Sequence, residues 1–196
     1  MKRLIMAIAG WLAISCSEKT ESVTYADDIA DGADALSSLQ YAEAITFFNA
    51  AIEKNPDRPE AYAGLGWAYL RMDNIDSSAS AFALGITKES PGADMYAGYA
   101  FLLNTDKEYA ASNTRVATAL SLSAQWTLTY GLGLDYKDLY LLKAENHFAL
   151  GEYTQSLNAV KVIESSFSAN VATAEGIAQL ANKIESLKAV AKAFDL

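Results

Sequence analysis

The sequence predicts an all-α fold, an α-solenoid of about four helical hairpins closed by a C-terminal capping helix. Three observations predict it. Small residues recur every 34 residues, as when Tyr-Ala-Gly at residues 62–64 returns at residues 96–98. All three prolines fall at the expected joins between hairpins. The chain is rich in Ala, Leu and Ser, a composition that favours helices over short strands.

The N-terminal stretch has the proportions of a secretory signal peptide. Lys2 and Arg3 precede an apolar run over residues 4–14. This run is shorter than the roughly 20 apolar residues that a membrane-spanning helix needs. It leads into Cys16, the single cysteine of the chain. The segment resembles the lipobox of bacterial lipoproteins. The alternative is an ordinary secretory signal cut near Ser15, which leaves an unmodified thiol.

The lipoprotein resemblance implies a location. Residues 1–15 would be removed as the signal peptide, and Cys16 would be lipidated at its thiol and its new amino group. Several acyl chains on one residue are enough for stable membrane anchoring. Residues 16–24 are polar and without apolar periodicity, which is typical of a short tether. We therefore expect a lipid-anchored protein of the bacterial cell envelope, at the outer membrane and facing the periplasm.

The repeat pattern divides residues 25–196 into successive units. Small residues fall 34 apart at Gly32, Gly66 and Ala100, and the register then jumps by ten residues before Ala144 continues the series. Glycine, alanine or serine is needed where two helix axes approach closely. One hairpin cannot bury its apolar face alone, whereas stacked copies share a core. The expected units are repeats at about 25–58, 59–92, 93–126 and 137–170, an insertion at 127–136 and a capping helix at about 171–194.

This pattern resembles the tetratricopeptide repeat, whose period is 34 residues. The second unit matches the family's marker positions best. The resemblance implies stacked hairpins whose first helices line a concave face, where peptides or partner helices lie. The marker residues of the second unit are Tyr62, Leu65, Gly66, Tyr69, Ser78, Phe82 and Gly85.

The register of the resembled family places a partner-binding groove on specific residues. The groove is aromatic and mildly acidic. Some members grip a C-terminal carboxylate with several basic and amide residues, but here Arg71 and Asn104 alone are suited to that role. An apolar or basic segment of a protein partner fits better. The alternative is that Trp67 and Phe101 merely pack against adjacent helices. The groove residues are Glu60, Ala63, Trp67, Leu70, Arg71, Asp94, Phe101, Asn104, Leu141, Glu145 and Phe148.

The insertion at 127–136, TLTYGLGLDY, departs from the repeat pattern. One interpretation is a long loop whose aromatic residues pack on neighbouring helices, and another is a flap over the groove. The aromatic residues also allow a second function, in which a glycan or an apolar small molecule stacks on Trp126, Tyr130 and Tyr136. The sequence leaves these alternatives open.

The amino-acid composition disfavours several classes of function. The net charge of −9 disfavours a nucleic-acid partner, because an acidic surface repels phosphates. One histidine and one cysteine do not make a usual zinc site, and His147 falls where the family places a packing aromatic. Nothing singles out a catalytic pair. We therefore expect no enzyme and no cofactor, but a membrane-anchored scaffold that binds a protein or peptide partner in the periplasm or envelope.

Overall fold

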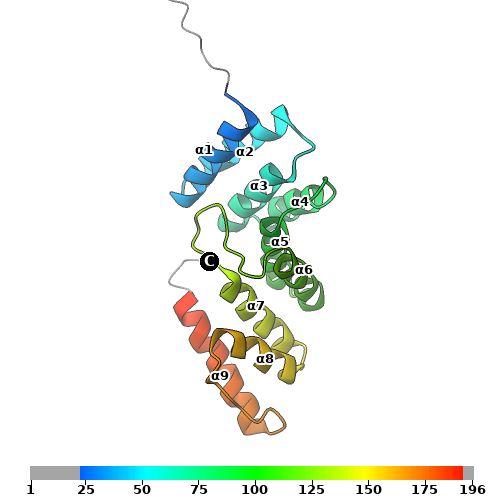
Figure 1. Cartoon of the computed structure of the whole chain (residues 1–196), viewed down its shortest axis with the longest axis vertical. Helices are drawn as coiled ribbons and strands as arrows, with labels where there is room; N and C mark the ends of the chain where they lie inside the picture. Colours follow the sequence, from blue (N-terminus) through cyan, green and yellow to red (C-terminus); the bar gives the residue numbers. More distant parts are fainter. Residues whose placement is uncertain (1–22, 192–196) are drawn as a thin grey trace, which may run out of the picture.

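The structure is a computed structural model that describes residues 23–191. The predicted signal peptide and the predicted lipidation site Cys16 lie outside these residues. The described part is all helical, and Figure 1 shows the helices stacked from α1 and α2 at the top to α8 and α9 at the bottom. The helices are α1 (Tyr25–Ser37), α2 (Tyr41–Lys54), α3 (Pro59–Arg71), α4 (Ile75–Gly85), α5 (Ala93–Thr105), α6 (Tyr109–Leu122), α7 (Tyr136–Ala149), α8 (Tyr153–Ile163) and α9 (Ala174–Ala191).

The helices pair as the repeat pattern predicts, and the all-α solenoid is confirmed. Each odd-numbered helix from α1 to α7 packs against the helix that follows it and against the next odd-numbered helix. A turn of three residues separates the two helices of every pair. The middle residue of each turn has a left-handed backbone conformation. Its φ is 61° at Leu39, 56° at Asp73, 62° at Lys107 and 75° at Gly151. The same backbone reversal therefore recurs in all four pairs.

A serine bridges the two helices of each of the last three pairs, which accounts for two of the small-residue series. The serine is fully buried on the second helix, and its hydroxyl donates to a main-chain carbonyl on the first. The short side chain therefore closes the gap between the helices and satisfies its own polar atom. The bonds run from Ser78 to Gly66 (2.9 Å), from Ser112 to Ala100 (2.8 Å) and from Ser156 to Ala144 (2.8 Å).

Glycines make room for the large side chains of the core. The ring of Phe48 is fully buried and lies against Gly32 of its own pair and Gly64 of the next. A Cβ atom would stand 2.7 Å from the ring at Gly32 and 2.3 Å at Gly64, which is closer than van der Waals contact. Phe82 takes the same position one repeat later, again between two glycines.

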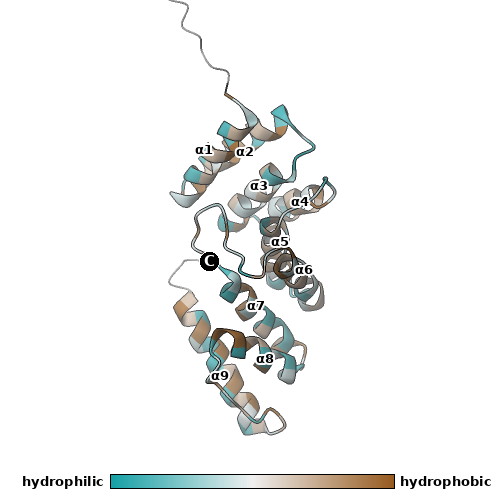
Figure 2. Cartoon of the chain, in the orientation of Figure 1, coloured by the Kyte–Doolittle hydropathy of each residue, from teal (hydrophilic) through white to brown (hydrophobic). Residues whose placement is uncertain are grey.

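The last helix, α9, covers α7 and α8. Leu180 is fully buried and Ile184 is 4 % exposed. Near the end of α9, Val190 is 69 % exposed. Each helix carries both polar and apolar segments in Figure 2. Between residues 23 and 191 there is no helix with the length and apolar character that crossing a membrane requires.

Candidate partner groove, divided by a strap

The insertion, residues 127–136, folds back over the first half of the stack, and we call it the strap. It leaves α6, runs toward α1 and α3, and returns to start α7 (Figure 1). An isolated antiparallel bridge pairs Thr127 with Asp135 near its two ends. Inside the bridge, the Leu128 amide donates to the Leu134 carbonyl at 2.9 Å. The strap is thus a narrow, mostly irregular loop whose ends are held together.

The tip of the strap is fixed by Tyr130. Its side chain is 4 % exposed, and its hydroxyl donates to the main-chain carbonyl of Glu60 at 2.8 Å. The ring meets Phe48 edge to face, with 5.7 Å between the ring centroids. Burial raises the pKa of the Tyr130 phenol well above its usual value, so the hydroxyl stays a donor at neutral pH. Next to it, Gly131 has a φ of +74° and lies against Ser37 at the end of α1.

The base of the strap is fixed by Asp94 at the start of α5. Its carboxylate accepts from the indole Nε1 of Trp126 at 2.6 Å and from the hydroxyl of Thr129 at 2.5 Å. The main-chain amide of Thr129 also donates to it, at 3.4 Å. One carboxylate therefore holds Thr129 of the strap and Trp126 just before it. Tyr130 packs on the helices, as the first interpretation of the insertion predicts, whereas a role as a flap over the groove stays a prediction.

The strap covers the N-terminal part of the predicted groove. Glu60, Ala63 and Asp94 line a hollow of about 410 Å³ beside the strap, together with residues of the strap itself. Ala63 is 3 % exposed and offers little surface. Trp126 and Tyr130 are buried by packing, so their rings are not open for a sugar to stack on.

The Glu60 carboxylate is held beside the strap by two partners. It receives a hydrogen bond from Arg58 at 2.7 Å and one from the Tyr25 hydroxyl at 3.3 Å. The hydrogen bond from Arg58 holds the pKa of Glu60 below its usual value. Burial, followed by the nearby Glu60 charge, raises the pKa of Tyr25 to about 12.

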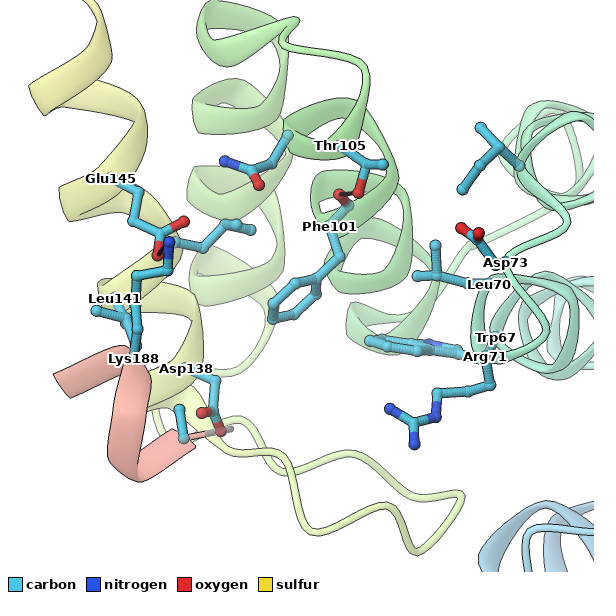
Figure 3. Close-up of a pocket in the computed structure, with 14 residues that line it drawn as sticks. Trp67, Leu70, Arg71, Asp73, Phe101, Thr105, Asp138, Leu141, Glu145 and Lys188 are labelled. Carbon is cyan, nitrogen blue, oxygen red and sulfur yellow. Dashed lines mark hydrogen bonds and ion pairs between the residues drawn. The ribbon is translucent and has the colours of Figure 1, made fainter. Parts of the chain in front are cut away.

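The C-terminal part of the predicted groove forms a cavity of about 310 Å³ between α3, α5, α7 and α9, which we call the central cavity. Figure 3 shows side chains from all four helices pointing into it. Seven of its lining residues are predicted groove residues: Trp67, Leu70, Arg71, Phe101, Asn104, Leu141 and Glu145. The other lining residues are Asp73, Ile75, Thr105, Asp138, Leu142, Lys188 and Ala191.

The apolar residues that line the central cavity differ in how much side-chain surface they expose to a partner. Trp67 is fully buried, and its Nε1 donates to the main-chain carbonyl of Asp94 at 3.0 Å. Its indole packs against Phe82 and Phe101, so Trp67 forms the floor of the cavity and not an exposed anchor. Phe101 and Leu70 are half-buried and present surface to the cavity, whereas Leu141 is 8 % exposed.

The cations of the central cavity are engaged by the protein itself. Arg71 lies over the ring of Tyr41, at 5.7 Å from its centroid, and its Nη2 donates to the Tyr41 hydroxyl at 3.2 Å. Lys188 pairs with Glu145 at 3.3 Å and with Glu185 at 3.5 Å. Although burial opposes the charge of Lys188, the neighbouring Glu145 holds its pKa above the usual value. Both members of the possible carboxylate-gripping pair thus already have a partner in the protein, Tyr41 for Arg71 and Asn146 for Asn104.

Two carboxylates at the central cavity have few hydrogen-bonding or charged partners within the protein. Within residues 23–191 no hydrogen bond or ion pair reaches the carboxylate of Asp73, which lies at the mouth of the cavity. Asp138 accepts from the Asp135 amide at 2.8 Å in the capping box of α7. Burial raises the pKa of Asp138 above its usual value. The cavity is thus lined by apolar side chains together with three carboxylates, Asp73, Asp138 and Glu145, and the two cations Arg71 and Lys188.

A buried amide fixes the side of the cavity formed by α5 and α7. Asn146 is fully buried and accepts from the amide of Asn104 at 2.8 Å. It donates in turn to Ser112 at 2.8 Å and to Asn113 at 3.0 Å. Phe148, the last predicted groove residue, lies outside the central cavity, in an adjoining hollow, and packs on Tyr153.

Seven lining residues were not among the predicted groove residues: Asp73, Ile75, Thr105, Asp138, Leu142, Lys188 and Ala191. The repeat register could not find Lys188 and Ala191, because α9 lies outside the repeats. Asp138 follows the N-cap Asp135 by three residues, a spacing that signals a capping box and not a groove.

His147 makes polar contacts near the protein surface. Its Nδ1 lies 2.5 Å from a carboxylate oxygen of Glu152 and 3.3 Å from the amide of Asn113. Among the described residues, no cluster of three or more His, Cys, Asp or Glu side chains is placed to hold a metal ion.

Comparison with known proteins agrees with this geometry. The family model described as tetratricopeptide repeat matches residues 35–100, from α1 into α5. This part of the chain carries tetratricopeptide repeats. The match contains Phe48 and Phe82 with three of the glycines that they pack against, Gly64, Gly66 and Gly98. It also contains the left-handed turns at Leu39 and Asp73.

Solved structures resemble most of the helical array. YrrB, described as a TPR protein with an unusual peptide-binding site, superposes with a TM-score of 0.64 at 12 % identity, covering 84 % of this chain and 86 % of that one. MamA gives 0.58 at 15 % identity, covering 82 % and 96 %. PilW, described as a type IV pilus biogenesis factor, gives 0.58 at 16 % identity, covering 70 % and 59 %. No curated protein matches the sequence. At these identities the likeness establishes the fold alone.

Proposed function

We propose that this protein is a membrane-anchored scaffold that holds a segment of a protein partner in its central cavity. The observation that carries the proposal is the cavity of about 310 Å³ between α3, α5, α7 and α9, where seven of the predicted groove residues meet. The half-buried side chains of Phe101 and Leu70 offer apolar contact there. Aromatic side chains, phenylalanine among them, are enriched in the buried core of protein interfaces.

The charges of the cavity indicate the chemistry of the segment. Arg71 is occupied by Tyr41, and Lys188 by Glu145 and Glu185. Asp73 and Asp138 remain as carboxylates that a partner can neutralise. An apolar segment that carries a basic side chain therefore fits better than a free C-terminal carboxylate. Recognition by a fixed cavity requires no reaction, so the scaffold is not an enzyme.

Site-specific photocrosslinking tests where the partner binds. A photoreactive residue at Thr105, which is exposed at the cavity, should crosslink a protein partner in detergent-solubilised membranes. The same residue at Ala117, exposed on α6 away from the cavity, should not. Leu70→Asp should abolish the Thr105 product, because it buries a charge against the apolar segment. The matched control Leu122→Asp alters a leucine that is 55 % exposed on α6 and should retain it. Equal crosslinking from Thr105 and Ala117 would refute the cavity as the site.

The anchor is part of the proposal. It is supported by the basic start, the short apolar run and the single cysteine at position 16. Mass spectrometry of the mature protein should find an acylated Cys16 at the N-terminus. Cys16→Ser should move the protein from the membrane fraction to the soluble envelope fraction. Retention of the variant in the membrane would show that another segment anchors it.

A further inference from the structure

We propose that the partner segment runs from the central cavity into the adjoining hollow, with a basic side chain beside Asp73 and an acidic side chain beside Lys107. This inference rests on the proposed scaffold function and adds to it the path and the charge order of the segment. Its basis is a pair of opposite charges, one beside each of two neighbouring hollows.

The central cavity and the adjoining hollow share a border. The adjoining hollow, which contains Phe148, has a volume of about 420 Å³ and lies between α5, the turn after it, α7 and α9. The residues that line both spaces are Asn104, Thr105, Glu145 and Lys188. An extended segment that fills the first space can therefore reach the second across these side chains.

The adjoining hollow offers apolar surface for a second side chain of the segment. Phe148 and Tyr109 are half-buried there, and Ile184 of α9 is 4 % exposed. The ring of Phe148 packs on Tyr153, with 5.2 Å between the ring centroids. Aromatic side chains are enriched in protein interfaces. We therefore expect the segment to place one apolar side chain in the central cavity and another in this hollow.

Each hollow has one exposed charge that the protein does not neutralise. Asp73 lines the central cavity and not the adjoining hollow, whereas the reverse holds for Lys107. In the part of the chain that the structure describes, no hydrogen bond or ion pair reaches the Lys107 ammonium, as is also the case for the Asp73 carboxylate. Both are middle residues of a left-handed turn, with φ of 56° and 62°. The same backbone reversal therefore holds opposite charges one repeat apart.

These two charges define the order of charges in the segment. A basic side chain beside Asp73 and an acidic one beside Lys107 give two attractions, whereas the opposite order brings like charges together. Complementary charges at an interface fix the register of the partner and disfavour wrong partners more than they raise affinity. The site therefore selects a segment by the order of its charges and not by its net charge.

Photocrosslinking with mapped products tests the path of the segment. A photoreactive residue at Ala149, which is exposed and lines only the adjoining hollow of these two spaces, should crosslink the same partner as one at Thr105. Mass spectrometry should place both crosslinks within about ten residues of one segment, since an extended chain gains about 3.5 Å per residue. That segment should carry a basic residue on one side and an acidic residue on the other. A product from Thr105 without one from Ala149, products on separate segments, or a product with a second copy of this chain overturns the proposal. The absence of both products contradicts the proposed function as well.

An exchange of charges between the two turns tests their order. The double variant Asp73→Lys, Lys107→Asp keeps the net charge, and each turn receives a residue that the other already holds at a left-handed φ. The crosslink yield from Ala149 should fall about fivefold or more, because two exposed attractions become repulsions. The matched control Asp57→Lys, Lys161→Asp exchanges exposed charges outside both hollows and should keep the yield. Equal yields from the two double variants overturn the charge order.

Discussion

The hydroxyl of Tyr130 donates to the main-chain carbonyl of Glu60 at 2.8 Å, and these two residues are 70 positions apart in the sequence. This contact ties the loop after the third hairpin to the start of the second. It divides the concave face into a strap-covered part and an open central cavity. The division decides which of the predicted groove residues a partner can reach.

Tyr130→Phe should lower the free energy of unfolding by about 1 kcal/mol, because the Glu60 carbonyl loses its donor while the ring stays in place. Urea unfolding followed by circular dichroism measures this. Tyr96→Phe is the matched control, since no hydrogen bond of the Tyr96 hydroxyl is present in the described part of the chain, and it should leave the midpoint unchanged. Equal midpoints for the two variants would mean that the bond contributes nothing.

Leu39→Gly should stabilise the protein. Leu39 has a φ of 61° and is 60 % exposed, so the leucine gains little packing in a strained conformation. Relief of that strain, offset by the entropy of glycine, should raise the free energy of unfolding by about 0.5 kcal/mol. Gly151→Ala, at the equivalent turn with a φ of 75°, should lower it by about 1 kcal/mol. Thermal unfolding of the two variants measures both changes in stability. Midpoints that move in the same direction for Leu39→Gly and Gly151→Ala would contradict this prediction.

Gly64→Ala should destabilise the protein by about 1–3 kcal/mol, because the new methyl group would stand 2.3 Å from the ring of Phe48. The double variant with Phe48→Val should lose less than the sum of the two single changes. The third repeat already combines a valine with a larger neighbour, as Val116 takes the place of Phe48 and Ala100 that of Gly32. A simple sum in a double-mutant cycle of urea midpoints would show that the methyl group and the ring do not collide.

Asn146→Ala should cost about 2 kcal/mol, because the amide of Asn104 and the hydroxyl of Ser112 lose a buried partner. Denaturant titration gives the value. Asn49→Ala on the exposed side of α2 serves as the control and should cost nothing measurable. A cost at Asn146 no larger than at Asn49 would mean that water replaces the network.

Stability should fall between pH 10 and pH 12. The folded chain raises the pKa of Tyr25 to about 12, whereas an unfolded phenol titrates near 10. The folded state therefore binds the proton more tightly, and its advantage is complete below pH 10 and is lost as the pH rises through 12. Tyr25→Phe should show a shallower decline of the urea midpoint over this range. Identical slopes would show that Tyr25 ionises alike in the folded and unfolded chains.

The fold could be predicted from the sequence because the contacts that determine it are local and recur at the repeat period. A serine such as Ser78 must be small for the hairpin to close, and Phe48 needs glycines opposite it, so both recur at the repeat period. The left-handed turn at Leu39 gave no such signal, because leucine does not mark that conformation as Gly151 does.

The candidate site was predictable only in part. The register placed Leu70, Phe101 and Leu141 on one surface, and the structure brings them together around the central cavity. Whether Trp67 faces solvent depends on its bond to the Asp94 carbonyl in the next repeat, which no spacing reveals. The path of the strap and the position of α9 depend on long-range packing outside the repeat, so the pattern carried no information about them.

The last helix does more than shield an apolar end. Lys188 and Ala191 of α9 line the same space as residues of α3 and α5, so the closing element also completes the site. An extra hairpin inserted ahead of α9 would carry these two residues away and leave the space open on that side. Duplication of units, the usual way in which such arrays grow in evolution, would therefore cost this protein its pocket, and we expect its number of hairpins to be constrained by function.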